Sequence, residues 1–331
     1  MSKIRPSKGA PYARIMGVGG YRPVRVVPNE VILETIDSSD EWIRSRSGIA
    51  TRHWASPEET VAAMSIEASG KAIADAGISA DQIGGVIVST VSHFKQTPAV
   101  ATEIADKLGT GKAAAFDISA GCAGFGYGLT LAKGMIVEGS AQYVLVIGVE
   151  RLSDLTDLQD RATAFLFGDG AGAVVVGPSE EPAIGPTVWG SEGDKSETIK
   201  QTVPWTEYDS SGKFPAITQE GQAVFRWAVF EMAKVAQQAL DAAGISPDDL
   251  DVFIPHQANM RIIDSMVKTL KLPDHVTVAR DVETTGNTSA ASIPLAMERL
   301  LATGQAKSGD TALVIGFGAG LVYAATVVTL P

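Results

Sequence analysis

The chain has 331 residues, 45% of them hydrophobic and 20% charged, which predicts a globular protein of two domains or of one duplicated domain. Its formal net charge of −11 at pH 7 argues against nucleic acid and anionic membranes as partners, because both are bound through clustered Lys and Arg. No apolar run approaches the roughly 20 residues that span a membrane, the first residues lack a secretory signal, and a single cysteine fits a reducing cytoplasm.

The first distinctive stretch in chain order is IMGVGGYRP, residues 15–23, which superficially resembles a dinucleotide-binding loop. Prolines follow where that fold requires a long helix, so we predict that Gly17, Gly19 and Gly20 form a turn. The four histidines show no metal-ligand spacing and the one cysteine cannot form a cluster, so no metal is expected.

Helices and strands then alternate along the chain, as in βαβ units, which predicts an α/β fold with mostly parallel sheets. The first half is predicted to contain helix 59–76, strand 84–91, helix 98–108, strand 113–119, helix 122–138 and strands 142–149 and 170–177. The second half is predicted to contain helix 219–243, strand 250–255, helix 259–270, strand 276–281, a helix from 287 to about 303, and strands 310–317 and 321–329.

The chain also repeats itself. AIADAGISADQIGGVIV (72–88) aligns without a gap with ALDAAGISPDDLDVFIP (239–255), so that Ala72 matches Ala239. LVIG recurs at 145–148 and 313–316, so that Leu145 matches Leu313. Because the two matches are separated by nearly the same length of chain, they indicate a duplication.

The helix over 122–138 has two charged residues, and a helix that is apolar nearly all round belongs in the centre of a protein. Its counterpart in the second half begins at Asn287. We therefore predict two sheets around a pair of central helices, with an N-terminal half, 1–178, and a C-terminal half, 179–331.

The only cysteine, Cys122, lies in AFDISAGCAGFGYG, where a strand meets the buried helix. Free N–H groups and the helix dipole at such a start favour the thiolate, which predicts a pKa below the usual value of about 8.5. The same N–H groups can stabilise an oxyanion on a carbonyl that the sulfur attacks. Position alone leaves two alternatives open, a reactive cysteine and a small buried packing residue.

The second half supplies polar partners at equivalent places. Strand 250–255 runs into PHQANMR, which places His256 and Asn259 at a carboxyl end, where parallel sheets bind ligands. Asn287 begins the second central helix. A helix N-cap and a hydrogen-bonded strand-end histidine are the structural alternatives. That Cys122, His256 and Asn287 take matching positions in a duplicated chain favours a function.

These motifs together are recognisable. DISAGCAGFGYG, FGDGAGAVVV (167–176), IPHQAN (254–259), GNTSAAS (286–292) and GFGAG (316–320) resemble β-ketoacyl-acyl-carrier-protein synthase III of the thiolase superfamily. The resemblance runs from IDSSDEWIRSRSGI (36–49) to the last strand. It implies a thiolase-like duplicated αβαβα fold of five layers, in which mostly parallel sheets surround two central helices, and no cofactor beyond the CoA thioester substrate.

The family pattern implies a triad of Cys122, His256 and Asn287. Cys122 takes the acyl group of an acyl-CoA primer, and malonyl-acyl carrier protein then loses CO₂ and attacks it, which initiates type II fatty-acid synthesis. His256 and Asn287 stabilise the enolate, and the backbone N–H groups of Cys122 and Ala319 form the oxyanion hole. Many members have Gly where Ala319 stands, so that contact is less secure.

Related enzymes fit less well. A thiolase requires a second active-site cysteine, which this chain lacks. Elongating condensing enzymes carry a second His in place of Asn287. Type III polyketide synthases share the Cys–His–Asn set, but the PHQANMR and Trp42–Arg46 segments resemble the initiation enzyme instead. Hydroxymethylglutaryl-CoA synthase requires a carboxylate near the thiol, and none is evident. An acyltransferase of secondary metabolism and a non-catalytic scaffold remain as alternatives.

The resemblance also implies substrate contacts. Trp42 and Arg161 match residues that hold the CoA adenine between an aromatic and a guanidinium plane, and Arg46 matches a phosphate contact. Asn259 matches a pantetheine contact, and Phe225 lines the same channel. Without the resemblance to the family, Trp42 would be interpreted as a partly buried aromatic residue at the surface.

An acidic carrier protein requires a local basic patch on this acidic enzyme, and we expect Arg226, Arg261, Lys268 and Lys271 to form it. The ordinary alternative is a set of scattered solvated charges.

In the family the loop carrying Thr97 reaches across a homodimer to the partner's acyl pocket, at a position where members restricted to short straight primers have Phe. The smaller Thr97 therefore predicts that branched or longer primers are accepted.

Overall fold

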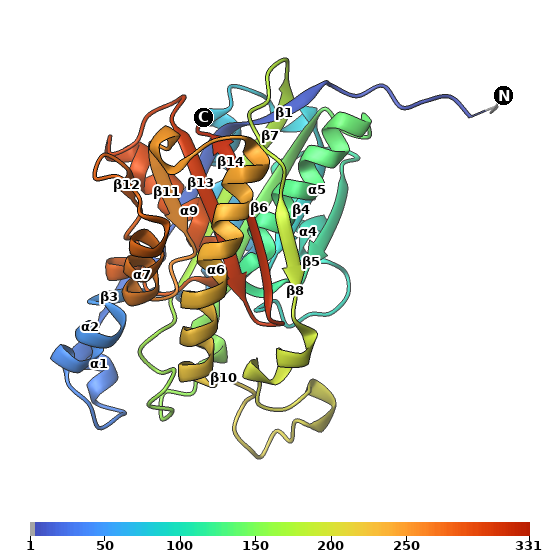
Figure 1. The fold of residues 1–331 in the computed structure, drawn as a ribbon. Coiled ribbons are helices and arrows are strands. Elements are labelled where there is room, and N and C mark those ends of the chain that lie inside the picture. The colour runs from blue at the N-terminus through green and yellow to red at the C-terminus, as the bar shows by residue number, and fades with distance from the viewer. Residues whose placement is uncertain (1–3) are drawn as a thin grey trace.

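The computed structural model describes residues 4–331, in which two five-stranded sheets lie side by side (Figure 1). The first has the order β1-β7-β6-β4-β5 and the second β8-β14-β13-β11-β12. Their bounds are β1 Tyr12–Tyr21, β4 Ile83–Ser89, β5 Ala114–Ile118, β6 Tyr143–Arg151, β7 Asp169–Ser179, β8 Val188–Ser191, β11 Val252–Pro255, β12 Thr277–Val278, β13 Thr311–Gly318 and β14 Val322–Thr329.

The two sheets repeat one topology, as the internal repeat predicts. In each sheet four strands point the same way and one, β7 or β14, is reversed. The sheets are thus mostly parallel in strand direction, while half of the neighbouring pairs are antiparallel because the reversed strand lies inside the sheet. The division at residues 178 and 179 stays a prediction.

Helices complete five layers. The long helices are α3 Val61–Asp75, α4 Val100–Leu108, α5 Gly124–Glu138, α6 Gly221–Ala243, α7 Met260–Leu270 and α9 Ser292–Ala302. The α5 and α9 helices contact strands of both sheets and form the central layer. The α3 and α4 helices cover the outer face of the first sheet. The α6 helix covers that of the second, with α7 packed beside it (Figure 1).

One apolar core runs through the central layer. It joins Phe125 and Leu129 of α5 to Val146 of β6, Ile293 of α9 and Val314 of β13, all at most 2% exposed. Each such side chain contributes about 1.5–3 kcal/mol by its burial. The predicted central position of the two helices is confirmed, and their N-termini are fixed inside the molecule.

The glycines of residues 15–23 lie in a strand, so the predicted turn is wrong. Gly17, Gly19 and Gly20 belong to β1, which pairs with β7. A Cβ on Gly19 would lie 2.2 Å from the Ala68 carbonyl oxygen of α3, and one on Gly17 would lie 2.4 Å from the backbone nitrogen of Ala76 at the end of that helix. The glycines let a helix approach the strand backbone closely.

The structure also contains short elements that the sequence did not predict. They are β2 Arg25–Pro28, α1 Asn29–Leu33, α2 Asp40–Ser47, β3 Thr51–Trp54, β9 Ile199–Gln201, β10 Ile217–Gln219 and α8 Val282–Thr285. The α2 helix begins where Ser39 Oγ accepts a hydrogen bond from Trp42 N (3.1 Å) and ends at Gly48, whose φ is 79°. Among the residues described, none of the helices combines the length and the apolar character that a bilayer crossing requires.

Candidate active site

Cys122 lies in η2, a single 3-10 turn over Gly121–Ala123 that joins β5 to α5. The end of β13 passes close beside it, because a Cβ on Gly318 would lie 2.8 Å from Cys122 Sγ. The cysteine is half-buried and lines a cavity.

The small residues around the cysteine serve packing as well as access. A Cβ on Gly124 would lie 1.8 Å from Ser89 Oγ, and one on Gly126 would lie 2.8 Å from the Ala324 side chain. These two glycines let the central helix pack against both sheets. Gly121, by contrast, lines the cavity next to the sulfur.

His256 follows the end of β11 and is held on two sides. Its Nδ1 lies 2.7 Å from Ser292 Oγ, at the first residue of α9, and its ring meets Phe317 edge-on at 5.3 Å. The residue is 2% exposed. With Nδ1 occupied, Nε2 is the nitrogen left to interact with a molecule in the cavity.

Asn287 lies in the segment between α8 and the 3-10 turn η7, Ser289–Ala291, which precedes α9. Its Oδ1 accepts the backbone N–H of Ser289 at 2.9 Å, and its own backbone N–H donates to Leu166 O at 2.9 Å. The amide orientation is therefore set, and the two hydrogens on Nδ2 remain free to donate.

The structure brings the three predicted residues together. Cys122, His256 and Asn287 line one cavity of about 80 Å³, and Ala319 lines the same cavity. Gly121 packs near the Ala319 backbone, since a Cβ there would lie 3.3 Å from Ala319 N. Side chains from both halves of the duplicated chain therefore meet at one point, where a thiol, an imidazole and a carboxamide face the same space.

The predicted lowering of the thiol pKa is wrong. Burial raises the pKa of Cys122 to about 12, although hydrogen bonds from the Ser289 hydroxyl and from its own backbone N–H act in the opposite direction. Burial lowers the pKa of His256 to about 3. Both groups are neutral at pH 7, so the thiol needs a proton acceptor when it reacts.

A carboxylate lies near the thiol, contrary to the prediction that none does. Glu150, near the end of β6, is fully buried, and its charge is one of the causes that raise the pKa of Cys122. The signal in the sequence was a charged residue in the otherwise apolar stretch YVLVIGVER, at the carboxyl end of a parallel strand.

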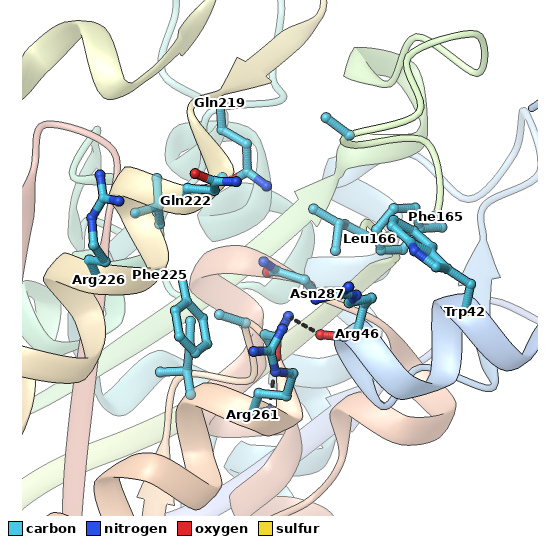
Figure 2. A pocket seen from close by; sticks show the side chains of 16 residues that line it. Trp42, Arg46, Phe165, Leu166, Gln219, Gln222, Phe225, Arg226, Arg261 and Asn287 are labelled. Atoms are coloured by element: carbon cyan, nitrogen blue, oxygen red, sulfur yellow. Dashed lines mark hydrogen bonds between the residues drawn. The ribbon is translucent and has the colours of Figure 1, made fainter. Parts of the chain in front are cut away.

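A larger cleft of about 590 Å³ adjoins this cavity, and Figure 2 shows the side chains that line it. Trp42 and Arg46 of α2 lie on one side and Phe225 and Arg226 of α6 on the other, with Asn287 between them. The cleft and the cavity share Gln219, Val224, Ala258, Ile262 and Asn287. An extended molecule that enters the cleft can therefore reach Cys122.

The two residues predicted to hold a purine are in contact with each other. The Arg161 guanidinium carbon lies 5.0 Å from the centre of the Trp42 ring. Two stacked contacts of ~3.5 Å require roughly 7 Å between the planes. A purine between them has to move the exposed Arg161 side chain away from the ring.

Other predicted contacts line the cleft. Asn259 caps α7: its Oδ1 accepts from Arg261 N and its Nδ2 donates to Arg46 O, both at 2.9 Å. One Nδ2 hydrogen remains for a ligand. Arg261 lies over the Phe225 ring, 4.7 Å from its centre.

Three further residues lie outside both cavities. Lys268 and Lys271 are exposed at the C-terminal end of α7, about 10 Å and about 15 Å along the helix from Arg261. Thr97 is exposed in the loop before α4 and is absent from the lining of the Cys122 cavity. Among residues 4–331 no three His, Cys, Asp or Glu side chains form a group that could hold a metal ion.

Comparison with known proteins identifies the family. Residues 116–193 match the family model of 3-oxoacyl-[acyl-carrier-protein] synthase III, and residues 240–330 match the model of its C-terminal part. A β-ketoacyl-[acyl-carrier-protein] synthase III of Streptomyces glaucescens is 90% identical over 333 residues, which cover 100% of both chains. The chain belongs to the β-ketoacyl-acyl-carrier-protein synthase III family.

Solved structures agree with this family. The priming β-ketosynthase from the R1128 polyketide biosynthetic pathway is 45% identical, with a TM-score of 0.97 over 100% of this chain and 99% of that one. The 3-oxoacyl-[acyl-carrier-protein] synthase III of Aquifex aeolicus VF5 is 38% identical, with a TM-score of 0.88 over 96% and 99%. The predicted synthase III family, its thiolase-like fold and its acyltransferase class are confirmed, whereas the roles of single side chains stay predictions.

Proposed function

We propose that the chain condenses an acyl-CoA primer with malonyl-acyl carrier protein and yields a β-ketoacyl-acyl carrier protein, CoA and CO₂. This is the initiation step of fatty-acid synthesis. The observation that carries the proposal is the convergence of Cys122, His256 and Asn287 on one cavity beneath an open cleft. No cofactor takes part, and we expect the reaction in the cytoplasm.

The first step transfers the acyl group. Cys122 Sγ attacks the thioester carbonyl, the new C–S bond forms, and the CoA thiolate leaves and takes up a proton. The negative charge that develops on the carbonyl oxygen accepts hydrogen bonds from the backbone N–H groups of Cys122 and Ala319. The narrow cavity keeps water away from the acyl-cysteine.

The second step forms the carbon–carbon bond. The malonyl C–C bond to the carboxylate breaks, CO₂ leaves, and the electron pair becomes an enolate. Asn287 Nδ2 and His256 Nε2 donate hydrogen bonds to the enolate oxygen. They therefore stabilise a negative charge that develops only as the reaction approaches the transition state. The enolate carbon attacks the acyl-cysteine carbonyl, the C–S bond breaks, and the sulfur regains a proton.

The cleft would hold the pantetheine arms of both substrates. Trp42 and Arg161 stack on the CoA adenine after Arg161 moves, Arg46 binds a phosphate, and Asn259 and Phe225 contact pantetheine. We propose that the carrier protein docks beside the cleft, on Arg226 and Arg261 at its lining and on Lys268 and Lys271 farther along α7. We also propose a homodimer, in which the loop carrying Thr97 completes the partner's acyl pocket and admits branched primers.

Incubation with radiolabelled acetyl-CoA, followed by malonyl-acyl carrier protein, tests the proposal. The native chain should first carry the label on Cys122 and then release it in a β-ketoacyl product. Cys122→Ala should abolish labelling, whereas His256→Ala and Asn287→Ala should become labelled and fail to condense. A native chain that takes no label would instead be a scaffold.

A second function in the same class rests on one observation, the TM-score of 0.97 to a priming ketosynthase of a polyketide pathway. The chemistry would be the same and the carrier protein different. Comparing kcat/KM for malonyl groups on a fatty-acid and on a polyketide carrier protein separates the two. A preference of tenfold or more for the polyketide carrier would favour this alternative.

A further inference from the structure

The thiol of Cys122 lacks an acceptor for its proton if His256 is arranged as the structure indicates. Ser292 Oγ accepts the backbone N–H of Gln257 at 3.3 Å and lies 2.7 Å from His256 Nδ1. Within residues 4–331 this fully buried hydroxyl has no other acceptor for its hydrogen, so it donates to Nδ1. The imidazole proton then lies on Nε2, where it donates to an oxyanion and cannot accept the thiol proton.

Glu150 is the other titratable group near the sulfur. Its carboxylate is fully buried at the end of β6 and is held by the loop that follows β4. It accepts hydrogen bonds from Ser92 Oγ at 2.6 Å, Val91 N at 3.1 Å and Thr90 Oγ1 at 3.3 Å. These partners are neutral, and none of them is a cation that would fix the carboxylate in its charged form.

Ser289 connects the carboxylate to the thiol. Ser289 lines the same cavity as Cys122, and its hydroxyl lies close enough to both groups to lower the pKa of Cys122 and that of Glu150. Its backbone φ is 47°, a conformation that non-glycine residues rarely adopt. The register that pairs Leu145 with Leu313 pairs Ser289 with Gly121, whose φ is also 47°. The second half therefore has a serine at the position equivalent to Gly121, in a backbone conformation that favours glycine. The serine supplies a hydroxyl that a glycine at this position would lack.

We propose that Glu150 accepts the Cys122 proton through Ser289 when the acyl group is transferred, an inference that rests on the proposed function. The thiol proton passes to Ser289 Oγ, and the Ser289 hydroxyl proton passes to a Glu150 carboxylate oxygen. Sγ then attacks the thioester, the C–S bond to CoA breaks, and the departing thiolate takes a proton from the cleft solvent. Glu150 returns its proton when condensation regenerates the free sulfur.

The electrostatics of the site support this transfer. Burial raises the pKa of Glu150 to about 7, so both protonation states are accessible near neutral pH. Cys122 is the titratable group that faces the carboxylate across Ser289, and the neighbouring Arg151 is paired with Asp154 at 2.9 Å. A base with a pKa near the working pH is the most effective general base.

The test measures single-turnover acylation of Cys122 by acetyl-CoA, followed by intact mass. Glu150→Gln keeps the shape and should slow acylation by about 10²-fold, and Glu150→Asp should restore part of the rate. Ser289→Ala and Ser289→Gly should both slow acylation, because both lack the hydroxyl although the glycine relieves the backbone. Asp169→Asn, which removes a buried carboxylate that does not line the Cys122 cavity, should leave the rate within about twofold.

Two further readouts separate proton transfer from a structural role. The native acylation rate should rise with pH with a midpoint near 7, and this midpoint should be absent in Glu150→Gln. Malonyl decarboxylation, measured in a Cys122→Ala background, should not change when Glu150→Gln is added.

Three results would overturn the inference: unchanged acylation in Glu150→Gln, a persistent midpoint near 7, or an equal loss in Asp169→Asn. If Glu150→Gln does not fold, the two Ser289 variants decide the question, and an unchanged rate in both overturns it. A native chain that never acylates Cys122 contradicts the proposed function instead.

Discussion

The hydroxyl of Ser292 has a consequence for the neighbouring imidazole that can be measured. Ser292 is the first residue of α9, and its Oγ lies 2.7 Å from His256 Nδ1. This contact selects the tautomer of His256 that carries its proton on Nε2. Without it, His256 would share its proton between two nitrogens and leave Nδ1 buried without a partner.

Ser292→Ala should therefore slow malonyl decarboxylation by about tenfold and leave acylation of Cys122 unchanged. Decarboxylation is followed by CO₂ release, and acylation by intact mass. Ser292→Thr keeps a hydroxyl and should retain most of the activity. An equal loss in both steps would mean that Ser292 acts only through the fold.

Burial of His256 also makes the stability of the protein depend on pH. The pKa of its imidazole is lowered to about 3 in the folded state, from a usual value near 6.5. Between these values the unfolded chain binds the additional proton, so the free energy of unfolding falls as the pH falls from 6.5 towards 3.

At pH 4, His256→Gln should remove about 3 kcal/mol of this decrease in the free energy of unfolding. At pH 7, where the imidazole is neutral in both states, the substitution should bring no such benefit. Urea denaturation of both proteins at the two pH values measures it. The comparison within one variant controls for lost packing, which acts equally at both pH values. A difference independent of pH would contradict neutral burial of the ring.

The β1 strand packs so closely on α3 that Gly17 and Gly19 cannot take a side chain without a shift of the backbone. Gly19→Ala would place a Cβ 2.2 Å from Ala68 O and 2.6 Å from Ala72 N, both backbone atoms that cannot move independently. We expect a loss of about 3 kcal/mol in the free energy of unfolding.

Gly70→Ala, in the α3 helix on which β1 packs, provides the matched control. Gly70 lies within α3, and a Cβ there meets nothing within 4 Å. The substitution should stabilise the protein by about 0.5–1 kcal/mol, because alanine favours the helix. Urea denaturation of both variants tests the pair, and equal effects would contradict the close approach of β1 and α3.

The glycines of β1 also show which features a local sequence pattern does not contain. Long elements with a clear period, such as α5 and β13, were predicted within a few residues because their apolar patterns are local. Gly17 and Gly19 are glycine because α3 passes above them, a contact between segments that are far apart in the sequence. No local pattern contains that information, and the same glycines at a turn would look identical.

The site likewise contains features that the sequence predicts and features that depend on contacts between distant segments. Cys122, His256 and Asn287 were predictable, because each follows a recognisable strand and the repeat places them in equivalent positions. The thiol pKa was not, since it depends on how deeply the surrounding sheets bury the sulfur. Glu150 and Ser289 were missed because their significance lies in a shared contact. The available signal was the internal repeat, whose register pairs Ser289 with Gly121.

Thr97, which we propose to limit primer size, lies outside the cavities near Cys122. A second cavity of about 470 Å³ adjoins the first and shares Val91, Ile199, Ile217 and Ala319 with it. Its lining includes Gln96, whereas the adjacent Thr97 is exposed and outside both linings. If Thr97 limits primer size, it does so for a second copy of the chain.

Thr97→Phe should reduce the use of isobutyryl-CoA relative to acetyl-CoA, because a larger side chain leaves less room for a branched acyl group. Thr97→Ser should preserve the native preference. Acylation rates of Cys122 with the two primers measure the ratio. An unchanged ratio in Thr97→Phe would show that Thr97 lies outside the acyl pocket.

Mixed dimers decide which copy Thr97 serves. Pairing a Thr97→Phe, Cys122→Ala chain with a native chain leaves one active cysteine that faces its partner's phenylalanine, and this dimer should disfavour isobutyryl-CoA. Pairing Thr97→Phe alone with Cys122→Ala alone puts the phenylalanine on the active chain itself, and this dimer should keep the native preference. The reverse pattern would place Thr97 in the pocket of its own chain, because the active cysteine then responds only to a substitution on the same polypeptide.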